Sequence, residues 1–421
     1  MSSVRVGTKW IGTRLALMVV VVGMMIAGAG WARGQTLTVL HSFGAEHDGY
    51  FPDSGVILDA SGNVYGETPE GGNQACFGFG CGILFEVTPG GSETILYTFP
   101  HEQKNWPTGG LIWDSQGNLY GTAEGLDDVG QNIYGGVFEL APGGNLTWLA
   151  LFSSQQNGYH PKSGVILDAQ GNLYGATSGG GGFDLGTIFK LAAGGKKSKR
   201  QETILHTFTG GSDGACPETG LIRDGEGNLY GTTAFGGGSG CYFGDGCGTV
   251  FKVSAEGEES VLYRFTGEAD GEDPQGPLVL DSEGNLYGTA NGGGDFSCGE
   301  VLGCGTVFEL ASDGTFTVLY AFTGEPDGAV PFAGLIMDAQ GNLYGTTQMG
   351  GEYNAGTVFE LTPSGTETVL YSFTGGVDGG LPESVLVFDG QGNLYGTTRK
   401  GGVYCQNPYV GGCGTVFKLT P

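Results

Sequence analysis

One short phrase, repeated seven times, constrains the fold of this chain more than any other feature. The phrase is Gly-Asn-Leu-Tyr-Gly, usually followed by two small residues, with Val in place of Leu in the first copy. Its first glycines lie 51 to 57 residues apart, at Gly62, Gly117, Gly171, Gly227, Gly284, Gly341 and Gly392. Self-similarity at such a period is typical of propellers, solenoids and other repeat arrays. The chain is therefore expected to repeat one supersecondary unit seven times.

Four apolar runs in each copy predict four β-strands. The first run ends in Asp just before the phrase, as in 110–114, and the phrase itself supplies the second run. A glycine-rich stretch of variable length leads to the third run, such as 356–361, and a short turn leads to the fourth, such as 368–373. Short runs rich in Val, Ile, Thr, Tyr and Phe, separated by Gly, Pro, Asn and Asp, are typical of strands.

The Asp-x-x-Gly-Asn motif that overlaps the phrase predicts a tight hairpin between the first and second strands. Its Asp is expected to make an Asx-type turn, and its Gly is expected to adopt a positive φ. The Tyr and Phe residues that recur at strand positions are expected to pack between neighbouring units.

Seven four-stranded antiparallel units predict an all-β fold, a seven-bladed β-propeller, because radial repetition leaves only short sheet edges. An open β-solenoid is the alternative. The order of strands favours closure, since the chain after residue 34 opens on a lone fourth strand, 36–43, and ends on a third strand, 414–420. We expect these two segments to pair and complete the last blade, which removes both end edges. The repeat cores are expected at about 55–99, 110–152, 164–208, 220–265, 277–322, 334–373 and 384–421 plus 36–43.

Residues 1–34 have the composition of a secretory signal peptide. Arg5, Lys9 and Arg14 precede an apolar stretch, and small residues follow it. This pattern is typical of cleaved signal peptides, and the stretch is shorter than the ~20 apolar residues of a retained membrane anchor. The mature propeller, residues 35–421, is therefore expected to be secreted, periplasmic or extracellular. We expect it to be a monomer with no membrane contact after cleavage.

The charge of the mature chain limits its partners. Without residues 1–34, 13 basic residues remain against 44 acidic ones, a formal charge of −31. Such a surface repels the phosphate backbone of nucleic acids and anionic lipid. Nucleic acid is therefore excluded as an expected partner. Solubility is the simplest role of this charge, and cation binding is the alternative.

Eight of the nine cysteines form close pairs in the loops between second and third strands: Cys76 and Cys81, Cys241 and Cys247, Cys298 and Cys304, Cys405 and Cys413. In an exported protein, close pairs in even number predict disulfides. Zinc is the alternative, because four thiolates from adjacent blades could converge, although these spacings are looser than the usual Cys-x2-Cys. Cys216 has no near neighbour in sequence and is expected to be an isolated thiol or to pair outside the chain.

Together these motifs resemble the GloVer tandem-repeat family of bacterial secreted or surface proteins. The resemblance covers about residues 36–421 and rests on Gly-Leu-Ile-x-Asp-x-x-Gly-Asn-Leu-Tyr-Gly-Thr-Thr, Gly-Thr-Val-Phe-Lys-Leu-Thr-Pro and Thr-Val-Leu-Tyr-Ser-Phe-Thr-Gly, in that order. The Asp-x-x-Gly-Asn-Leu-Tyr core is also similar to NHL-type propeller repeats, which implies a fold and not a function. The family is often called choice-of-anchor because a sorting tail follows the repeats. This chain ends at Pro421 directly after the last strand, so release is expected in place of surface tethering.

Topology gathers the variable loops on one face. Loops between second and third strands, and crossings between blades, emerge at the same end of an up-and-down blade. Binding residues concentrate on loops held by a rigid scaffold, so we expect any ligand on this face. Aromatic loop residues are candidate apolar platforms for it: Tyr134, Tyr242, Phe243, Tyr353, Tyr404 and Tyr409. The alternative is that they pack within their own glycine-rich loops.

A second repeated motif, Asp-Gly-x-x-Pro, lies in the crossings. Its acidic residues are Asp48, Asp213, Asp270, Asp327 and Asp378, while the third blade has Asn157 in their place. We expect these oxygens to form a ring around the channel mouth, which could hold calcium or a cationic ligand. The alternative is structural, because Asp-Gly favours turns and Pro suits the start of a strand.

No catalytic motif stands out, and no catalytic residue is assigned. The chain lacks a Ser nucleophile elbow, an HExxH motif and a phosphate-binding loop. Apart from the calcium considered above, no cofactor is expected. The sequence favours a binding or structural module for extracellular glycan or protein, with the ligand on the loop-bearing face. The alternative is a propeller hydrolase or lyase acting on carbohydrate or lactone at the central channel, with His47 beside Asp48, or His160 near Asn157, as candidate acid–base groups.

Overall fold

The computed structural model describes most of the chain after residue 34. The described residues are 35–45, 47–72, 80–100, 105–125, 134–152, 157–194, 200–238, 240–241, 245–299, 302–403 and 412–421. They belong to one compact unit, Gln35–Pro421, and contain no helix, hence none long and apolar enough to cross a membrane. The expected signal peptide, residues 1–34, lies outside the described residues.

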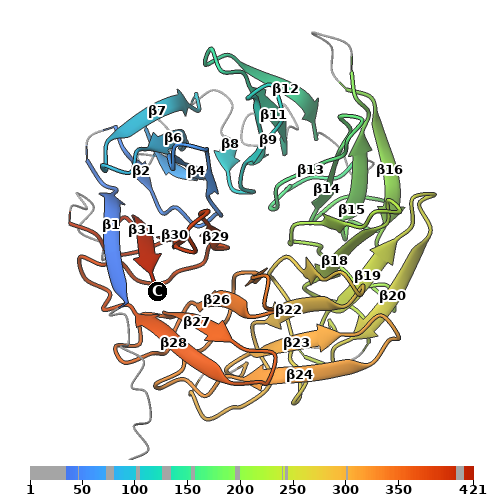
Figure 1. The fold of residues 1–421 in the computed structure, drawn as a ribbon. Coiled ribbons are helices and arrows are strands. Elements are labelled where there is room, and N and C mark those ends of the chain that lie inside the picture. Colours follow the sequence, from blue (N-terminus) through green and yellow to red (C-terminus); the bar gives the residue numbers. More distant parts are fainter. Residues whose placement is uncertain are drawn as a thin grey trace, which may run out of the picture. The chain divides into compact units, whose positions relative to one another are not determined.

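Seven small antiparallel sheets stand in a ring, six of four strands and one that gains a fifth short strand, so the protein is a seven-bladed β-propeller, as the repeats predicted (Figure 1). First strands are two residues long: Ile57–Leu58 (β3), Ile112–Trp113 (β9), Ile166–Leu167 (β13), Ile222–Arg223 (β17), Val279–Leu280 (β21), Ile336–Met337 (β25) and Val387–Phe388 (β29). Second strands carry the repeated phrase: Val64–Thr68 (β4), Leu119–Gly125 (β10), Leu173–Thr177 (β14), Leu229–Thr233 (β18), Leu286–Ala290 (β22), Leu343–Thr347 (β26) and Leu394–Thr398 (β30).

The third and fourth strands complete each blade, and the fourth is outermost (Figure 1). Third strands are Ile83–Val87 (β6), Gly135–Leu140 (β11), Thr187–Leu191 (β15), Thr249–Val253 (β19), Thr306–Leu310 (β23), Thr357–Leu361 (β27) and Thr415–Thr420 (β31). Fourth strands are Glu93–Thr98 (β7), Leu146–Leu151 (β12), Glu202–Thr207 (β16), Glu259–Arg264 (β20), Phe316–Ala321 (β24), Glu367–Ser372 (β28) and Thr36–Ser42 (β1). Three short strands lie in the crossings and loops: Gly49–Tyr50 (β2), Glu70–Gly71 (β5) and Asn105–Pro107 (β8).

The N-terminal strand closes the ring, as expected. β1 pairs antiparallel with β31, from Thr36 opposite Thr420 to Ser42 opposite Thr415. The sheet order β1-β31-β30-β29 makes the first strand in sequence the outermost strand of the last blade. This pairing satisfies the edge of β31 without a covalent link.

The core lies between blades, where the recurring phenylalanines meet. In each seam, a Phe just after the fourth strand of one blade packs against the third-strand Phe of the next blade, with ring centroids 5.0 to 5.6 Å apart. Phe43 and Phe85 form this pair across the closure, and both are fully buried. The expectation that these residues pack between blades is confirmed.

Packing also explains the last glycine of the repeated phrase. A Cβ atom at Gly231 would lie 2.7 Å from Cζ of Phe251, and the equivalent glycines face their third-strand Phe at 2.5 to 2.8 Å. Real Cβ contacts essentially never come so close. A side chain at this position would therefore displace the aromatic ring that fills the seam.

The Asp-x-x-Gly-Asn segments form the expected hairpin turns. Asp59 Oδ1 accepts hydrogen bonds from the amides of Ser61 and Asn63, and its Oδ2 accepts one from the Tyr65 hydroxyl. Gly62 adopts a φ of 80°, which glycine tolerates best. The repeated phrase is thus one unit of turn and seam chemistry.

Candidate functional site

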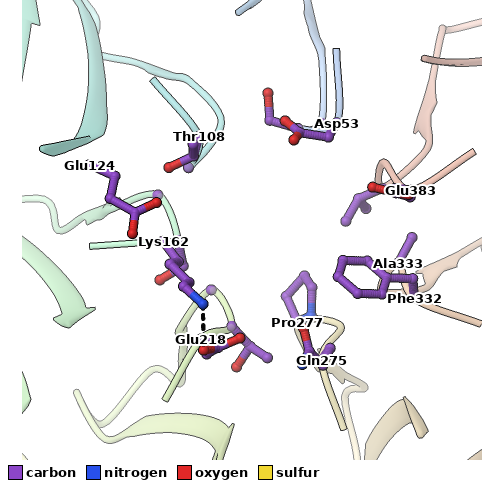
Figure 2. Close-up of a pocket in the computed structure, with 18 of the residues that line it drawn as sticks. Asp53, Thr108, Glu124, Lys162, Glu218, Gln275, Pro277, Phe332, Ala333 and Glu383 are labelled. Atoms are coloured by element: carbon purple, nitrogen blue, oxygen red, sulfur yellow. Dashed lines mark hydrogen bonds and ion pairs between the residues drawn. The ribbon is translucent and has the colours of Figure 1, made fainter. Parts of the chain in front are cut away.

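A pocket of about 370 Å³ lies where side chains from all seven blades converge. It opens on the face that carries the crossings, because its lining begins directly after each crossing. Figure 2 shows the lining side chains projecting into a common space from separate blades. A pocket of this size falls within the roughly 300–1,000 Å³ range of small-ligand sites.

The residue that follows the crossing proline lines this pocket in every blade. In blade order these residues are Asp53, Thr108, Lys162, Glu218, Gln275, Phe332 and Glu383 (Figure 2). Seven equivalent positions thus carry six residue types, whereas the packing and turn positions of the same repeats hardly vary. The repeats therefore diverge where their side chains converge.

The backbone holds these positions from both sides. The residue just before the crossing proline has a positive φ of 51° to 60° in six blades: Phe51, His160, Cys216, Asp273, Val330 and Leu381. Val330 shows how this conformation is fixed, since its amide donates to the Cys304 carbonyl of the preceding blade and its carbonyl accepts from the Gln348 amide. Positive φ is uncommon for a β-branched residue. Such strain persists only where the surroundings impose it, as at preorganised binding sites.

Charged side chains in the pocket form ion pairs, one between neighbouring blades and one within the last blade. Lys162 Nζ lies 2.7 Å from Glu218 Oε1. Arg399 Nη1 lies 3.3 Å from Glu383 Oε1, which also accepts a hydrogen bond of 2.6 Å from Gln348 Nε2. Cationic and amide donors thus lie next to carboxylate acceptors at two places on the wall, and these pairs fix the positions of Glu218 and Glu383.

Two carboxyl groups beside the pocket have raised pKa values. Burial, with a further contribution from the Glu383 carboxylate, raises the pKa of Asp53 to about 7. Burial also raises the pKa of Glu67 to about 8, against the effect of a 2.6 Å hydrogen bond from the Gly110 amide. The Asp53 carboxylate adds to the increase for Glu67. The two carboxyl groups are thus electrostatically coupled.

Glu67 is the exception among the seven blades. The other six have small residues at its position: Thr122, Ala176, Thr232, Thr289, Thr346 and Thr397. The Glu67 side chain is almost fully buried, and its Oε2 atom has no hydrogen-bond partner among the described residues. Buried carboxyl groups with shifted pKa values next to a pocket are typical of sites that move protons or bind ligands.

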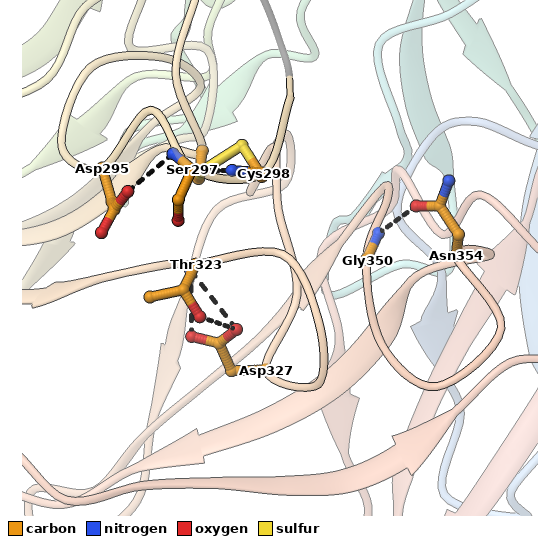
Figure 3. Close-up of a disulfide and its surroundings, with 8 residues drawn as sticks. Asp295, Ser297, Cys298, Thr323, Asp327, Gly350 and Asn354 are labelled. Atoms are coloured by element: carbon orange, nitrogen blue, oxygen red, sulfur yellow. Dashed lines mark hydrogen bonds between the residues drawn. A yellow bond between two sulfur atoms is a disulfide. The ribbon is translucent and has the colours of Figure 1, made fainter.

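The aspartates of the crossing motif lie away from this pocket. Asp327 accepts hydrogen bonds from the amide and hydroxyl of Thr323 and from the Tyr320 hydroxyl, as Figure 3 shows for Thr323. Asp270 and Asp378 are bonded in the same way. These carboxylates accept the hydrogen bonds that close the turn after the fourth strand. This agrees with the alternative that the Asp-Gly pair of the crossing motif serves to form a turn.

Asp48, Asp213 and Asn157 occupy the same turns with different partners. Asp48 accepts from the Gly44 amide and contacts His41, and Asp213 accepts from the amide and hydroxyl of Thr209. The Asn157 amide donates to Glu202. None of the six crossing residues lines the pocket, whose wall is formed by residues five positions later. A ligand role for the six stays a prediction.

The candidate histidines occupy different environments. His160 Nδ1 lies 2.7 Å from Oε1 of Glu124, a pocket-lining residue, so His160 stands at the pocket edge. An acid–base role for His160 near Asn157, or for His47 beside Asp48, stays a prediction. His47 Nδ1 lies 3.4 Å from the Gly72 carbonyl oxygen.

Only some of the candidate loop aromatics are described. Tyr353 is 54% exposed, whereas the Tyr134 ring packs 5.5 Å from the Tyr159 ring. Neither residue lines the pocket of about 370 Å³ described above. Four candidates lie outside the described residues: Tyr242, Phe243, Tyr404 and Tyr409.

Disulfides form in the loops between second and third strands, as predicted. Cys241 pairs with Cys247 and Cys298 with Cys304, the latter shown in Figure 3. Cys81 and Cys413 are also disulfide-bonded, while Cys76 and Cys405 lie outside the described residues. Cys216 is a free, half-buried thiol, and burial raises its pKa to about 11.

The pocket lining was missed by sequence reasoning because its signal is variation. The motifs that repeat with constant spacing predict turns and packing between blades, and they do not include the pocket-lining residues. When the seven repeats are aligned, the residues on both sides of the crossing proline differ from copy to copy, and the residue after the proline is the one that lines the pocket in every blade.

Comparison with known proteins supports the fold. The extracellular domain of a protein assigned as a hybrid two-component system of B. thetaiotaomicron superposes with a TM-score of 0.54 and 12% identity, over 91% of this chain and 39% of that one. A gluconolactonase of Xanthomonas campestris gives a TM-score of 0.41 at 14% identity, over 91% and 89% of the two chains. A second protein assigned as a gluconolactonase gives 0.40 at 18% identity, over 75% and 88%. At these identities the first likeness concerns the fold alone, and the other two carry no argument.

Sequence comparison identifies the repeats themselves. No curated protein sequence matches the chain. The model of the Gloeobacter/Verrucomicrobia repeat matches residues 126–304 and 297–421, which together cover more than half of the chain. The chain belongs to the Gloeobacter/Verrucomicrobia repeat family.

Proposed function

We propose that this propeller is an exported glycan-binding protein whose ligand occupies the channel-mouth pocket. The observation that carries the proposal is the divergence of seven symmetry-equivalent positions at the one place where their side chains meet. If the residue after the crossing proline served only the fold, the same residue could be used in every blade. The residue before the proline also varies between blades, but only the residue after it brings its side chains together in the pocket, where they can contact one asymmetric ligand.

The chemistry of the lining suits a sugar. Sugar hydroxyls both donate and accept hydrogen bonds, and the wall supplies fixed cationic and amide donors next to fixed carboxylate acceptors. Phe332 adds an apolar ring on which the C–H face of a sugar can pack (Figure 2). The volume of about 370 Å³ accommodates one or two sugar residues.

Charge narrows the class of glycan. Four carboxyl groups line the pocket, from Asp53, Glu124, Glu218 and Glu383, against the two cationic side chains of Lys162 and Arg399. This balance, inside a strongly acidic chain, disfavours uronic acids and sulfated sugars. Neutral sugars and amino sugars are the expected ligands.

Independent features support export. The N-terminal 34 residues have the composition of a signal peptide, and two disulfides among the described residues are typical of oxidising compartments. Both features agree with an extracellular or periplasmic glycan as the partner.

The test begins with the mature chain on a glycan array and continues by calorimetric titration of the best binder. Phe332→Ala and Glu383→Gln are each expected to weaken binding at least tenfold. Phe183→Ala removes a 62%-exposed aromatic side chain that is absent from the pocket lining, so it is the matched control and should bind as the wild type does. Unchanged affinity in both pocket variants would contradict the proposal.

A second function is favoured by one specific observation, the coupled carboxyl groups of Asp53 and Glu67. A carboxyl group with a pKa near neutrality can act as a general acid or base. The pocket would then belong to a hydrolase or lyase acting on carbohydrate or lactone. Turnover of sugar lactones or oligosaccharides by the wild type, lost in Glu67→Thr, would move the assignment from binding to catalysis. Thr is the residue at this position in five other blades, so the variant keeps a local solution the fold already uses.

A further inference from the structure

A cluster of three potential ligands lies at the seam where the ring closes, away from the channel pocket. His41 comes from β1 of the last blade, Asp48 from the turn after it, and Glu93 from the start of β7 in the first blade. We propose that these three side chains bind one divalent transition-metal ion of the zinc class, which joins the last blade to the first.

The distances fit such an ion. One ligand atom from each residue lies within 4.8 Å of the other two. His41 Nε2 is 3.2 Å from Asp48 Oδ2 and 3.8 Å from Glu93 Oε2. Zinc bonds of about 2.0–2.2 Å in tetrahedral geometry place ligand atoms roughly 3.3–3.6 Å apart, between these two values. Small rotamer adjustments therefore suffice to complete the site.

The surroundings also favour a cation. The Asp48 and Glu93 side chains are 3% and 15% exposed, so two carboxyl groups meet with little water to separate them. Asp48 also accepts hydrogen bonds from the amides of Gly44 and Gly49, and the buried Oε1 atom of Glu93 has no partner among the described residues, a feature shared with Glu259 and Glu367 and therefore not special to this seam. The only cationic group of the cluster is His41, which is charged only when it is protonated. A bound metal ion would supply the missing positive charge, and the 17% exposure of His41 leaves a side open for water as a further ligand.

In other seams, a tyrosine takes the place of His41 in the fourth strand. Tyr263, Tyr320 and Tyr371 stand where His41 stands, and each donates its hydroxyl to the aspartate of its own turn. Tyrosine completes the turn but offers no imidazole nitrogen. His41 can make the same hydrogen bond to Asp48, so the structural role and the metal role predict different outcomes when His41 is replaced by Tyr.

A near copy of the cluster provides an internal comparison. In the seam between the third and fourth blades, His206 stands at the same position and its Nε2 lies 3.6 Å from Asp213 Oδ2. Glu259 begins β20 as Glu93 begins β7. Among the described residues, however, this set does not bring three ligand atoms within 4.8 Å of one another. It is the natural control for a seam with similar residue types and looser geometry.

The experiment uses the mature chain without an affinity tag, in the oxidised state and with Cys216→Ser in every sample, so that no free thiol competes for metal. Calorimetric titration of metal-free protein with Zn²⁺ is expected to show one site, accompanied by a rise in Tm of several degrees, since a ligand that binds only the folded state stabilises it. His41→Tyr should keep the metal-free Tm, lose the Zn²⁺-dependent rise and weaken binding at least tenfold. Glu93→Gln should weaken binding similarly, whereas His206→Tyr should bind as the parent does.

Three results would overturn the proposal. The first is no heat and no change in Tm with Zn²⁺. The second is full Zn²⁺ binding by both single variants, His41→Tyr and Glu93→Gln. The third is loss of binding in His206→Tyr alone, which would place the ion in the other seam. None of these outcomes bears on the channel pocket, so the glycan proposal is tested separately.

Discussion

Replacing Glu67 by Gln should make the propeller more stable at neutral and alkaline pH. The carboxyl group of Glu67 is buried in the folded chain and solvated in the unfolded chain, so its pKa is raised on folding to about 8. Gln has nearly the same shape, stays neutral, and can still accept the hydrogen bond from the Gly110 amide. The variant therefore removes the ionisation and keeps the contact.

The sign and size of the effect follow from the pKa change. The folded state holds the Glu67 proton more tightly than the unfolded state does. The stabilisation of the folded state by this proton is therefore fully present below the unfolded pKa of 4.5, and it is lost as pH rises to about 8. One pKa unit corresponds to ~1.4 kcal/mol, so the loss is of order 4–5 kcal/mol across this window. Glu67→Gln should match the wild type near pH 4.5 and exceed its stability by up to about this amount at pH 8. Ionisation of the Asp53 carboxyl group, with a pKa of about 7, also lowers the stability of the folded state as pH rises. The stability of the variant should therefore still decrease somewhat with pH.

Chemical denaturation at a series of pH values measures the difference directly. Glu256→Gln is the control, because Glu256 is exposed on a turn and its replacement should leave the wild-type pH profile in place. Wild type and Glu67→Gln profiles that run parallel from pH 4.5 to pH 8 would show that folding does not raise the pKa of Glu67. A Glu67→Gln variant that is less stable at every pH would show instead that the carboxyl group makes a specific contact that Gln cannot replace.

Three further predictions concern the scaffold. Deleting residues 35–44 removes β1 and exposes the edge of β31, so the truncated chain should aggregate or melt far below the full mature chain, and equal melting would contradict closure by this strand. Gly231→Ala should cost about 1–3 kcal/mol in denaturation experiments by overpacking against Phe251, while Gly225→Ala, where an added Cβ meets nothing within 4 Å, should cost much less. Peptide mapping without reduction should recover linked pairs at 241–247 and 298–304, and the predicted pairs at 76–81 and 405–413; eight free thiols with stoichiometric zinc would contradict this.

The architecture could be predicted because its determinants repeat. The seam phenylalanines, the phrase glycine and the Asp-x-x-Gly-Asn hairpin solve the same packing problem seven times, so spacing alone identified blade number and strand order. Ring closure followed from the phase of residues 36–43 and 414–420, since an unpaired fourth strand and an incomplete last blade need each other.

The candidate site could not be predicted in the same way. We expected the crossing aspartates around the channel mouth, but in the motif at Asp327 the residue four positions earlier, Thr323, offers two donors and holds the carboxylate on the outer turn. The next residue to reach the channel is Phe332, after the proline, and no motif marks it. Likewise, nothing in the sequence brings Glu93 to His41 until the ring is closed.

A crystal structure of the mature chain with the glycan selected from the array would show whether the ligand occupies the channel-mouth pocket. We expect sugar density in the pocket of about 370 Å³, packed on Phe332 and hydrogen-bonded to Glu383 or its neighbours on the wall. Sugar density on the outer loops, for instance beside the exposed ring of Tyr353, with an empty channel mouth, would contradict it.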